Sequence, residues 1–184
     1  MKNEKNPWII LSSEEKYDNA WINLTEFQVI NPNGGKGIYG KVHFKNLAIG
    51  IIPIDKNDEI VLIGQYRFPL NQYSWEIPEG GGKIGIDPLE SAKRELLEET
   101  GLKANRWTKL MEMHLSNSVS DELAIIYVAE DLEQFNAEPE ETEQLEIKKI
   151  QFSEALKLVM NGEITDSMTV AALLKYELIR NSRT

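Results

Sequence analysis

Apolar and polar residues alternate in the first quarter of the chain in a pattern typical of β-strands. Trp21–Ile30 and Gly37–Phe44 carry side chains suited to a pleated, half-buried surface, and Asn31–Gly35 between them is a turn sequence. A hairpin of two strands is only marginally stable in water on its own. We therefore expect residues 1–45 to form a small antiparallel β-sheet piece that packs on the rest of the chain or on a second copy.

Strands and helices follow one another in residues 46–184, which we expect to form the main domain. Short apolar runs bounded by polar turns predict strands, and longer runs with helical spacing between capping residues predict helices. The predicted strands are 47–54, 59–66, 106–113, 122–129 and 145–152, and the predicted helices are 88–100, 153–160 and 167–180. Strands interleaved with helices of this length indicate an α/β sandwich.

The most sharply bounded helix lies between Asp87 and Gly101. Asp87 is a favourable N-cap residue, Pro88 suits the first helical position, and Glu90 completes a capping box. Gly101 supplies the left-handed conformation that ends many helices. The glycines just upstream of this helix are expected in a loop whose backbone approaches metal and phosphate.

Three carboxylates, Glu95, Glu98 and Glu99, share one face of this helix because they are three and four residues apart. Each like-charge pair costs about 0.2–0.5 kcal/mol, and Arg94 can pair with Glu90 or Glu98 but cannot neutralise all three. The row calls for cations, and ligands that are all oxygen select hard ions such as Mg²⁺ or Mn²⁺. The competing interpretation is an acidic helix face that is simply solvated.

Composition and charge argue against several classes of function. The 184 residues carry a net charge of −10 and no run of Lys or Arg, which argues against nucleic acid and membrane surfaces as partners. Cysteine is absent, which excludes disulfides and a thiol nucleophile, and two histidines are too few for a histidine-rich metal site. The N-terminus lacks the apolar core of a signal peptide and no apolar run is long enough to span a bilayer, so a cytoplasmic location is expected.

Residues 80–102 resemble the Nudix box. The box consists of Gly, five residues, Glu, seven residues, Arg-Glu-hydrophobic, one residue, Glu-Glu, one residue and Gly-hydrophobic. Eight of the nine specified positions match, and the departure is Ile86, where the family usually has Glu. The matching positions are Gly80, Arg94, Glu95, Leu96, Glu98, Glu99, Gly101 and Leu102. The resemblance implies the Nudix α/β/α sandwich around a mixed β-sheet, with the N-terminal sheet piece appended.

The similarity extends to segments outside the box. QYRFP at 65–69, WEIPEG at 75–80, SDE at 120–122 and G-x-I-x-D at 162–166 resemble the ADP-ribose and nucleoside-diphosphate-sugar pyrophosphatases. The resemblance implies a homodimer in which the N-terminal sheet is exchanged or packed across the interface and its aromatic side chains help to stack the base. The candidates are Trp21, Phe27 and Tyr39, each of which would otherwise be an ordinary core residue of a strand.

The implied reaction is metal-dependent hydrolysis of a nucleoside diphosphate sugar to a nucleoside monophosphate and a sugar phosphate. Asn117 stands where ADP-ribose-specific members often carry a proline, so GDP-mannose joins ADP-ribose as an expected substrate. Two other functions stay open. One is a catalytically weak Nudix domain that binds nucleotide sugars as a sensor, which Ile86 motivates, and the other is a hydrolase of nucleoside triphosphates or dinucleoside polyphosphates.

The resemblance assigns the metal to the central helix and to the residue before the box. It implies Glu95 and Glu99 as the principal ligands of Mg²⁺, with Mn²⁺ as the alternative ion. It implies that Glu98 shares the metal or bridges to it through water, and that the backbone carbonyl of Glu79 is a further ligand.

Candidates for substrate binding and proton transfer lie outside the helix. Arg67 has a fork of donors suited to clamping a diphosphate, and the alternative is a surface ion pair. Glu76 is expected to contact the substrate or to support the metal site. Similar enzymes carry the general base just before the late strand, which implies Glu143 and, as second choice, Glu141, although a solvated acidic loop would have the same sequence.

Overall fold

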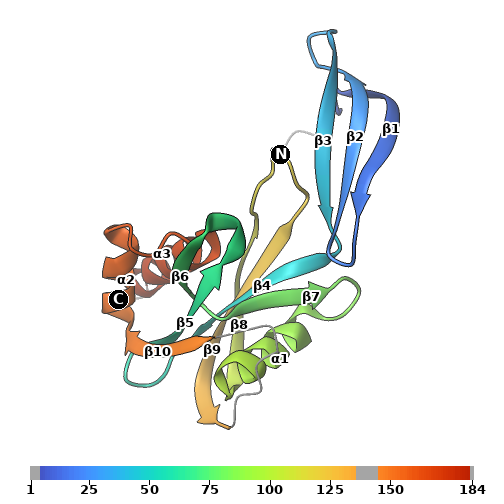
Figure 1. Cartoon of the computed structure of the whole chain (residues 1–184). Coiled ribbons are helices and arrows are strands. Elements are labelled where there is room, and N and C mark those ends of the chain that lie inside the picture. The colour runs from blue at the N-terminus through green and yellow to red at the C-terminus, as the bar shows by residue number, and fades with distance from the viewer. Residues whose placement is uncertain (1–4, 136–144, 183–184) are drawn as a thin grey trace. The chain divides into compact units, whose positions relative to one another are not determined.

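The computed structural model describes residues 5–135 and 145–182 (Figure 1). Contacts between Cα atoms divide the chain into two compact units. The smaller unit holds the chain up to Asn46 together with Ser116–Glu122, and the larger unit holds Leu47–Leu115 and the chain from Leu123 onward. Within the described residues, no helix combines the length and the apolarity needed to cross a membrane.

The smaller unit contains an antiparallel sheet of three strands in the order β1-β2-β3. These strands are β1 (Ile9–Asp18), β2 (Ile22–Ile30) and β3 (Lys36–Phe44). The predicted hairpin is present as the antiparallel pair of β2 and β3, and β1 adds a third strand that the sequence analysis did not identify. Its register shifts twice, and every residue in it is exposed. Its sequence therefore lacks the regular alternation of apolar and polar residues by which a strand with one buried face is recognised.

The segment Ser116–Glu122 belongs to the smaller unit because it binds β3. The Asp121 carboxylate lies 2.8 Å from Lys41 Nζ and 2.8 Å from His43 Nδ1, and it accepts a hydrogen bond from the Phe44 N–H at 3.0 Å. Burial acts to raise the pKa of Asp121, but these hydrogen bonds and the charge of Lys41 lower it to about 2. The predicted SDE segment is thus fixed to the N-terminal sheet by its aspartate.

The described residues of the larger unit form two sheets and three α-helices. The sheet orders are β7-β4-β9-β8, in which β4 and β9 are parallel and β8 and β9 antiparallel, and β10-β5-β6, which is antiparallel. The strands are β4 (Asn46–Pro53), β5 (Glu59–Arg67), β6 (Gln72–Glu76), β7 (Glu79–Lys83), β8 (Leu102–His114), β9 (Leu123–Gln134) and β10 (Glu146–Gln151). The helices are α1 (Pro88–Thr100), α2 (Phe152–Met160) and α3 (Ser167–Asn181), and a short 3₁₀ turn covers Phe68–Leu70.

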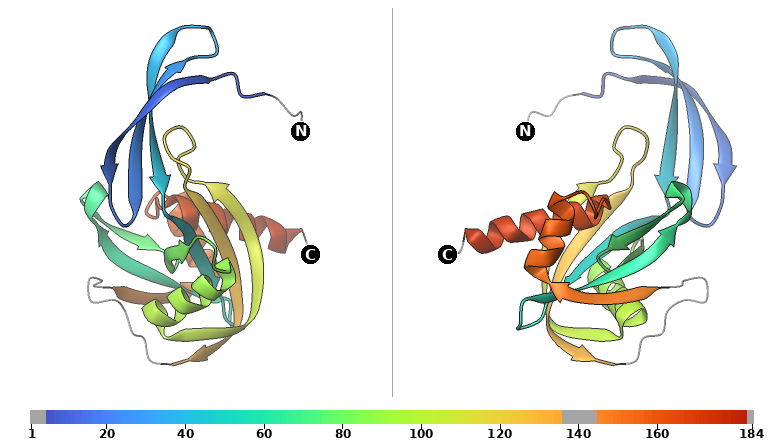
Figure 2. Two further views of the ribbon diagram at one scale, coloured as in Figure 1. Left: turned by 90° about the vertical axis from the view of Figure 1, so that its right-hand side faces the viewer. Right: turned by 60° about the vertical axis from the view of Figure 1, so that its left-hand side comes forward.

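Alternate residues of the central strands serve two separate cores. On β4, Ile49 and Ile51 pack in a cluster with Leu96 of α1, whereas Ile52 packs in a cluster with Phe152 of α2. Successive side chains of a strand point to opposite faces, so a strand buried on both faces needs an unbroken apolar run. Figure 2 shows α1 on one face of the sheet and α2 and α3 on the other. The predicted α/β/α sandwich is therefore confirmed.

The glycine-rich stretch before α1 differs from the prediction. We expected a loop there, but Glu79–Lys83 forms β7 at the edge of the mixed sheet. A Cβ added to Gly82 would lie 2.8 Å from Cγ1 of Ile49, which is closer than side chains approach in real proteins. Glycine therefore lets this strand lie tightly against β4, and only Gly85, at a φ of 91°, takes the turn conformation.

Candidate active site

Helix α1 presents its carboxylates in a defined position because local interactions fix both of its ends. The Asp87 side chain accepts a hydrogen bond from the Leu89 N–H at 3.0 Å, and Gly101 ends the helix at a φ of 69°. The predicted cap and stop are confirmed. The predicted capping box is wrong in its second half, because the Glu90 side chain accepts a hydrogen bond from Lys93 instead.

Two of the three carboxylates on α1 are buried. Glu95 is 8% exposed and Glu99 is 3% exposed, whereas the Glu98 side chain is 31% exposed. Arg94 donates to both Glu95 and Glu98, and also to the Gly81 carbonyl oxygen at 2.9 Å. Buried carboxylates are stable only beside cations or hydrogen-bond donors. The Arg94 guanidinium therefore neutralises part of the negative charge on α1, and its bond to Gly81 links the helix to β7.

The backbone at the start of β7 lies directly against the α1 carboxylates. The Glu79 N–H donates to Glu99 Oε2 at 3.1 Å. A Cβ built on Gly80 would lie 2.3 Å from Cδ of Glu95 and 2.5 Å from each of its carboxylate oxygens. The first glycine of the box is thus required for a close approach between main chain and carboxylate.

The α1 carboxylates have the chemistry that suits a hard divalent cation. Glu95, Glu98 and Glu99 offer only oxygen as donor atoms, although among the described residues the carboxylates whose oxygens converge within 4.8 Å of one another are those of Glu76, Glu79 and Asp166. Oxygen-only sets of this kind suit Mg²⁺ and Mn²⁺ and do not suit softer metals. Because Gly80 has no side chain, its main chain can lie directly beside the Glu95 carboxylate.

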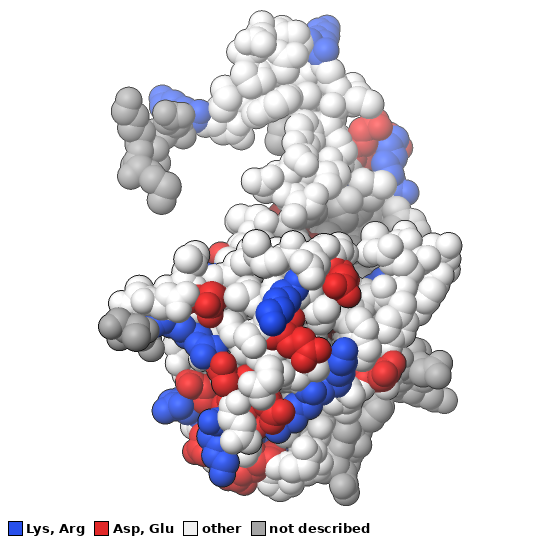
Figure 3. Space-filling model, turned by 90° about the vertical axis from the view of Figure 1, so that its left-hand side faces the viewer, with Lys and Arg blue, Asp and Glu red and all other residues white. Residues whose placement is uncertain are grey.

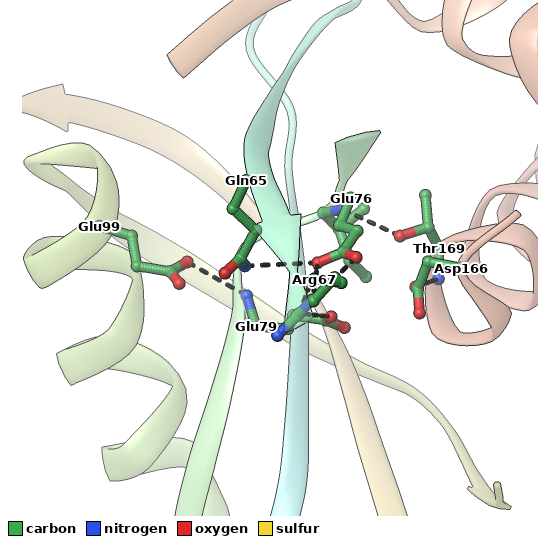
Figure 4. A network of polar contacts seen from close by, with 8 residues as sticks. Gln65, Arg67, Glu76, Glu79, Glu99, Asp166 and Thr169 are labelled. Atoms are coloured by element: carbon green, nitrogen blue, oxygen red, sulfur yellow. Dashed lines mark hydrogen bonds and ion pairs between the residues drawn. The ribbon is translucent and has the colours of Figure 1, made fainter. Parts of the chain in front are cut away.

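Arg67 lies at the centre of a second polar network, which Figure 4 shows between α1 and α3. Its Nε donates to both Glu76 oxygens at 3.0 Å, and its Nη2 donates to Glu76 Oε2 and Glu79 Oε1, each at 2.5 Å. The side chains of Glu76 and Glu79 are 3% and 11% exposed. The structure thus brings these three predicted residues together and directs most of the Arg67 fork toward protein carboxylates.

The two carboxylates around Arg67 differ in their affinity for protons. Burial and the charges of Asp166 and Glu76 raise the pKa of Glu79 well above its ordinary value. Burial also acts to raise the pKa of Glu76, but the hydrogen bonds and charge of Arg67 hold it below its ordinary value. Among the described residues, Glu79 Oε2 has no hydrogen-bond partner. Glu76 is therefore the firmly ionised partner of Arg67.

Sequence reasoning missed the third carboxylate of this network, Asp166. One oxygen from each of Asp166, Glu76 and Glu79 lies within 4.8 Å of the others. Asp166 also caps α3 by accepting a hydrogen bond from the Thr169 N–H at 2.7 Å. These carboxylates and Arg67 line a cavity of about 240 Å³. The sequence identifies Asp166 as a helix cap and as the end of G-x-I-x-D, but neither signal reveals which strands it meets.

The predicted stacking residues lie in the smaller unit and differ in their surroundings. Phe27 and Tyr39 line a cavity of about 410 Å³, together with Trp8, whose ring makes an edge-on contact with Tyr39 at 5.3 Å. Trp21 is 68% exposed and does not line this cavity. Trp8 was not among the predicted stacking residues, because strand β1, which follows it, was not predicted from the sequence. The two predicted bases, Glu141 and Glu143, lie outside the described residues.

Charged side chains of both signs are interspersed on the face of the protein seen in Figure 3. Opposite charges are paired in the larger unit, where Lys149 contacts Asp55 and Glu59, and Arg180 contacts Asp58. In the described part of that face, no extended basic stripe is visible.

Two family models match the chain. The model described as "NUDIX domain" matches residues 44–168. The model described as "Nucleoside diphosphate sugar hydrolase N-terminal domain" matches residues 8–42. The two matches lie end to end and together run through most of the sequence.

Known proteins are similar to the chain over much of their length. The ADP-ribose pyrophosphatase of Bacillus subtilis (strain 168) is 30% identical over 170 residues, with 91% of each chain covered. The GDP-mannose pyrophosphatase of Escherichia coli O1:K1 / APEC is 32% identical over 126 residues, covering 64% of this chain and 66% of the relative. A crystal structure of an ADP compounds hydrolase covers 99% of this chain and 98% of its own, with a TM-score of 0.87 at 23% identity. That structure therefore shares the fold.

Proposed function

Because the chain belongs to the Nudix family of hydrolases, we propose that it hydrolyses the diphosphate of a nucleoside diphosphate sugar. ADP-ribose and GDP-mannose are the expected substrates, and a nucleoside monophosphate and a sugar phosphate are the expected products. The match of residues 8–42 to a nucleoside diphosphate sugar hydrolase N-terminal domain supports this choice over a hydrolase of nucleoside triphosphates.

The observation that carries the proposal is the meeting of buried carboxylates and main chain at the start of β7. Glu99 accepts the Glu79 N–H, and Glu95 lies against Gly80 where any side chain would collide with it. We propose that Glu95, Glu99 and the Glu79 carbonyl hold Mg²⁺, or Mn²⁺ in its place, and that Glu98 shares the ion or binds it through water. When bound, the ion would neutralise charge on the phosphate oxygens and lower the pKa of a bound water.

Hydrolysis needs a water molecule that attacks one phosphorus while the bond from that phosphorus to the bridging oxygen breaks. We propose that Glu143 accepts the proton of the water, with Glu141 as the second choice. Among the described residues, no acceptor is paired with Nη1 of Arg67, so this nitrogen can bind a diphosphate oxygen while Nε and Nη2 stay with Glu76 and Glu79. Arg67 would thereby hold the substrate close to the α1 carboxylates.

A substrate panel tests the proposal. The protein is incubated with ADP-ribose, GDP-mannose, ATP and a dinucleoside polyphosphate, each with Mg²⁺, and released phosphomonoesters are measured. We expect turnover of one or both nucleotide sugars, and loss of that turnover in Glu99→Gln with an unchanged circular dichroism spectrum. Glu112→Gln, which changes an exposed carboxylate on β8, is the matched control. Faster turnover of ATP than of either nucleotide sugar would refute the substrate class.

One observation favours a second candidate function, a sensor that binds nucleotide sugars with little turnover. Ile86 stands where the box usually has Glu, and it is 51% exposed. The helix does not depend on that position, because Asp87 caps it. Equilibrium dialysis with ADP-ribose and GDP-mannose distinguishes the two functions. Binding without product over a long incubation would favour the sensor, whereas product formation supports the enzyme.

We also propose that the protein is a homodimer that associates through the N-terminal sheet. Large apolar side chains of the smaller unit are exposed, among them Ile9 at 55%, Ile10 at 60% and Ile38 at 66%. Exposed apolar side chains that gather on one surface often mark a protein interface. In such a dimer, Trp21, Phe27 and Tyr39 would be placed to stack on the base of the nucleotide. Sedimentation equilibrium tests the dimer, and a monomer at micromolar concentration would refute it.

A further inference from the structure

The segment that joins β6 to β7 is attached to three other elements of the larger unit. The Ile77 N–H donates to the Thr169 hydroxyl of α3 at 2.9 Å, and the Pro78 carbonyl accepts from the Ile51 N–H of β4 at 2.9 Å. The Glu79 N–H donates to Glu99 of α1 at 3.1 Å. A shift of this segment would therefore move the peptide group that faces the α1 carboxylates.

Side chains at the two ends of the segment bind the same guanidinium. Glu76 stands at its start and Glu79 follows three residues later, and both accept hydrogen bonds from Arg67 (Figure 4). A guanidinium is planar and rigid, so a carboxylate that engages two of its nitrogens fixes its orientation as well as its position. Glu76 thus determines how Arg67 is presented to Glu79.

Glu76 is poorly placed to touch a substrate. It is only 2% exposed, so a ligand in the cavity that it lines with Arg67 would find almost no surface of it. Both of its oxygens accept from Arg67 Nε at 3.0 Å, and Oε2 also lies 3.4 Å from the side-chain nitrogen of Gln65. Its acceptor capacity is therefore used within the protein.

We propose that Glu76 is a positioning residue, which acts through Arg67 on Glu79 and thereby on the divalent-cation ligands of α1. By orienting Arg67, Glu76 maintains the hydrogen bond from the Glu79 N–H to the Glu99 carboxylate in the substrate-free protein. This inference rests on the proposed function, because it takes the α1 carboxylates as metal ligands. Replacing a residue that orients metal ligands typically weakens metal affinity by about 10–100-fold.

The experiment measures Mn²⁺ binding to the substrate-free protein by electron paramagnetic resonance. The variants are Glu76→Gln, which removes the charge of the carboxylate, and Arg67→Lys, which keeps the half-buried cation but loses the fork. Arg106→Gln is the matched control, because it breaks the exposed ion pair with Glu130 elsewhere in the larger unit. Hydrogen exchange of the Glu79 amide is followed by NMR in parallel.

We expect both network variants to bind Mn²⁺ at least about tenfold more weakly than the wild type and to exchange the Glu79 amide faster. Arg106→Gln should match the wild type in both measurements. If both network variants keep wild-type Mn²⁺ affinity and only the substrate KM rises, Glu76 and Arg67 contact substrate and the inference is overturned while the proposed function stands. If the wild type and Glu99→Gln bind Mn²⁺ equally well, the proposed function fails and the inference fails with it.

Discussion

Replacing Gly80 with alanine tests the close approach between β7 and α1 by adding a single methyl group. The new Cβ would lie 2.3 Å from Cδ of Glu95, whereas ordinary contacts of this kind begin at 3.4 Å. The Glu95 carboxylate must therefore move by about 1 Å, since the neighbouring main chain is held by the Glu79–Glu99 hydrogen bond. No left-handed backbone conformation is recorded at Gly80, so the substitution acts through this contact and not through φ.

A displacement of about 1 Å in a catalytic group can cost about 100-fold in rate. That loss corresponds to about 2.7 kcal/mol of transition-state stabilisation. We therefore expect kcat/KM for ADP-ribose or GDP-mannose to fall about 100-fold in Gly80→Ala, whereas the free energy of unfolding should change little because the atoms that must move are the end of the flexible Glu95 side chain. The assay pairs phosphomonoester release with urea denaturation.

Gly37→Ala provides the control for adding a methyl group. A Cβ at Gly37 would meet nothing within 4 Å, and that residue lies at the exposed start of β3. It should change neither the rate nor the unfolding midpoint appreciably. If Gly80→Ala retains wild-type kcat/KM, the contact between Gly80 and Glu95 does not hold the carboxylate in its catalytic position, and the reasoning is refuted.

Three further predictions concern stability. Thr169→Val leaves the buried Ile77 N–H without its acceptor and should cost about 1–3 kcal/mol in urea unfolding, whereas Thr169→Ser should retain most of the stability. Asp87→Ala removes the α1 cap and should cost about 1 kcal/mol, measured in the same way. The pKa of Asp121 is about 2 in the folded chain against an ordinary 3.8, so its contribution is present above about pH 4 and is lost as the pH falls through 2. Because Asp121 is partly exposed, we expect about 1 kcal/mol, and Asp121→Asn should flatten this part of the unfolding profile; an unchanged profile would contradict the assignment.

Local signals predicted the helix at the centre of the site. Asp87 and Gly101 mark its ends by interactions within a few residues, and Glu95 and Glu99 share a face because of helical spacing alone. The continuous apolar run of β4 likewise predicted a strand, and the structure buries that strand on both faces. These features depend on interactions between residues that are close in the sequence, so local sequence patterns were enough to predict them.

Features that depend on distant contacts were missed. β1 has no regular alternation and no buried side chain, so only its pairing with β2 makes it a strand. The glycines of β7 are typical of loops, and their place in a strand follows from the approach of Ile49. Thr169 meets the segment after β6 across 92 residues, and no spacing rule connects positions so far apart.

The smaller unit is completed by a segment that is synthesised much later than its strands. A fragment that stopped after Asn46 would leave Lys41 and His43 without the Asp121 carboxylate that they share. A fragment that began after it would keep Ser116–Glu122 but lose the strand on which that segment rests. The two sequence-continuous halves are therefore poor candidates for separate expression, and a nascent chain cannot complete the smaller unit until Glu122 has left the ribosome.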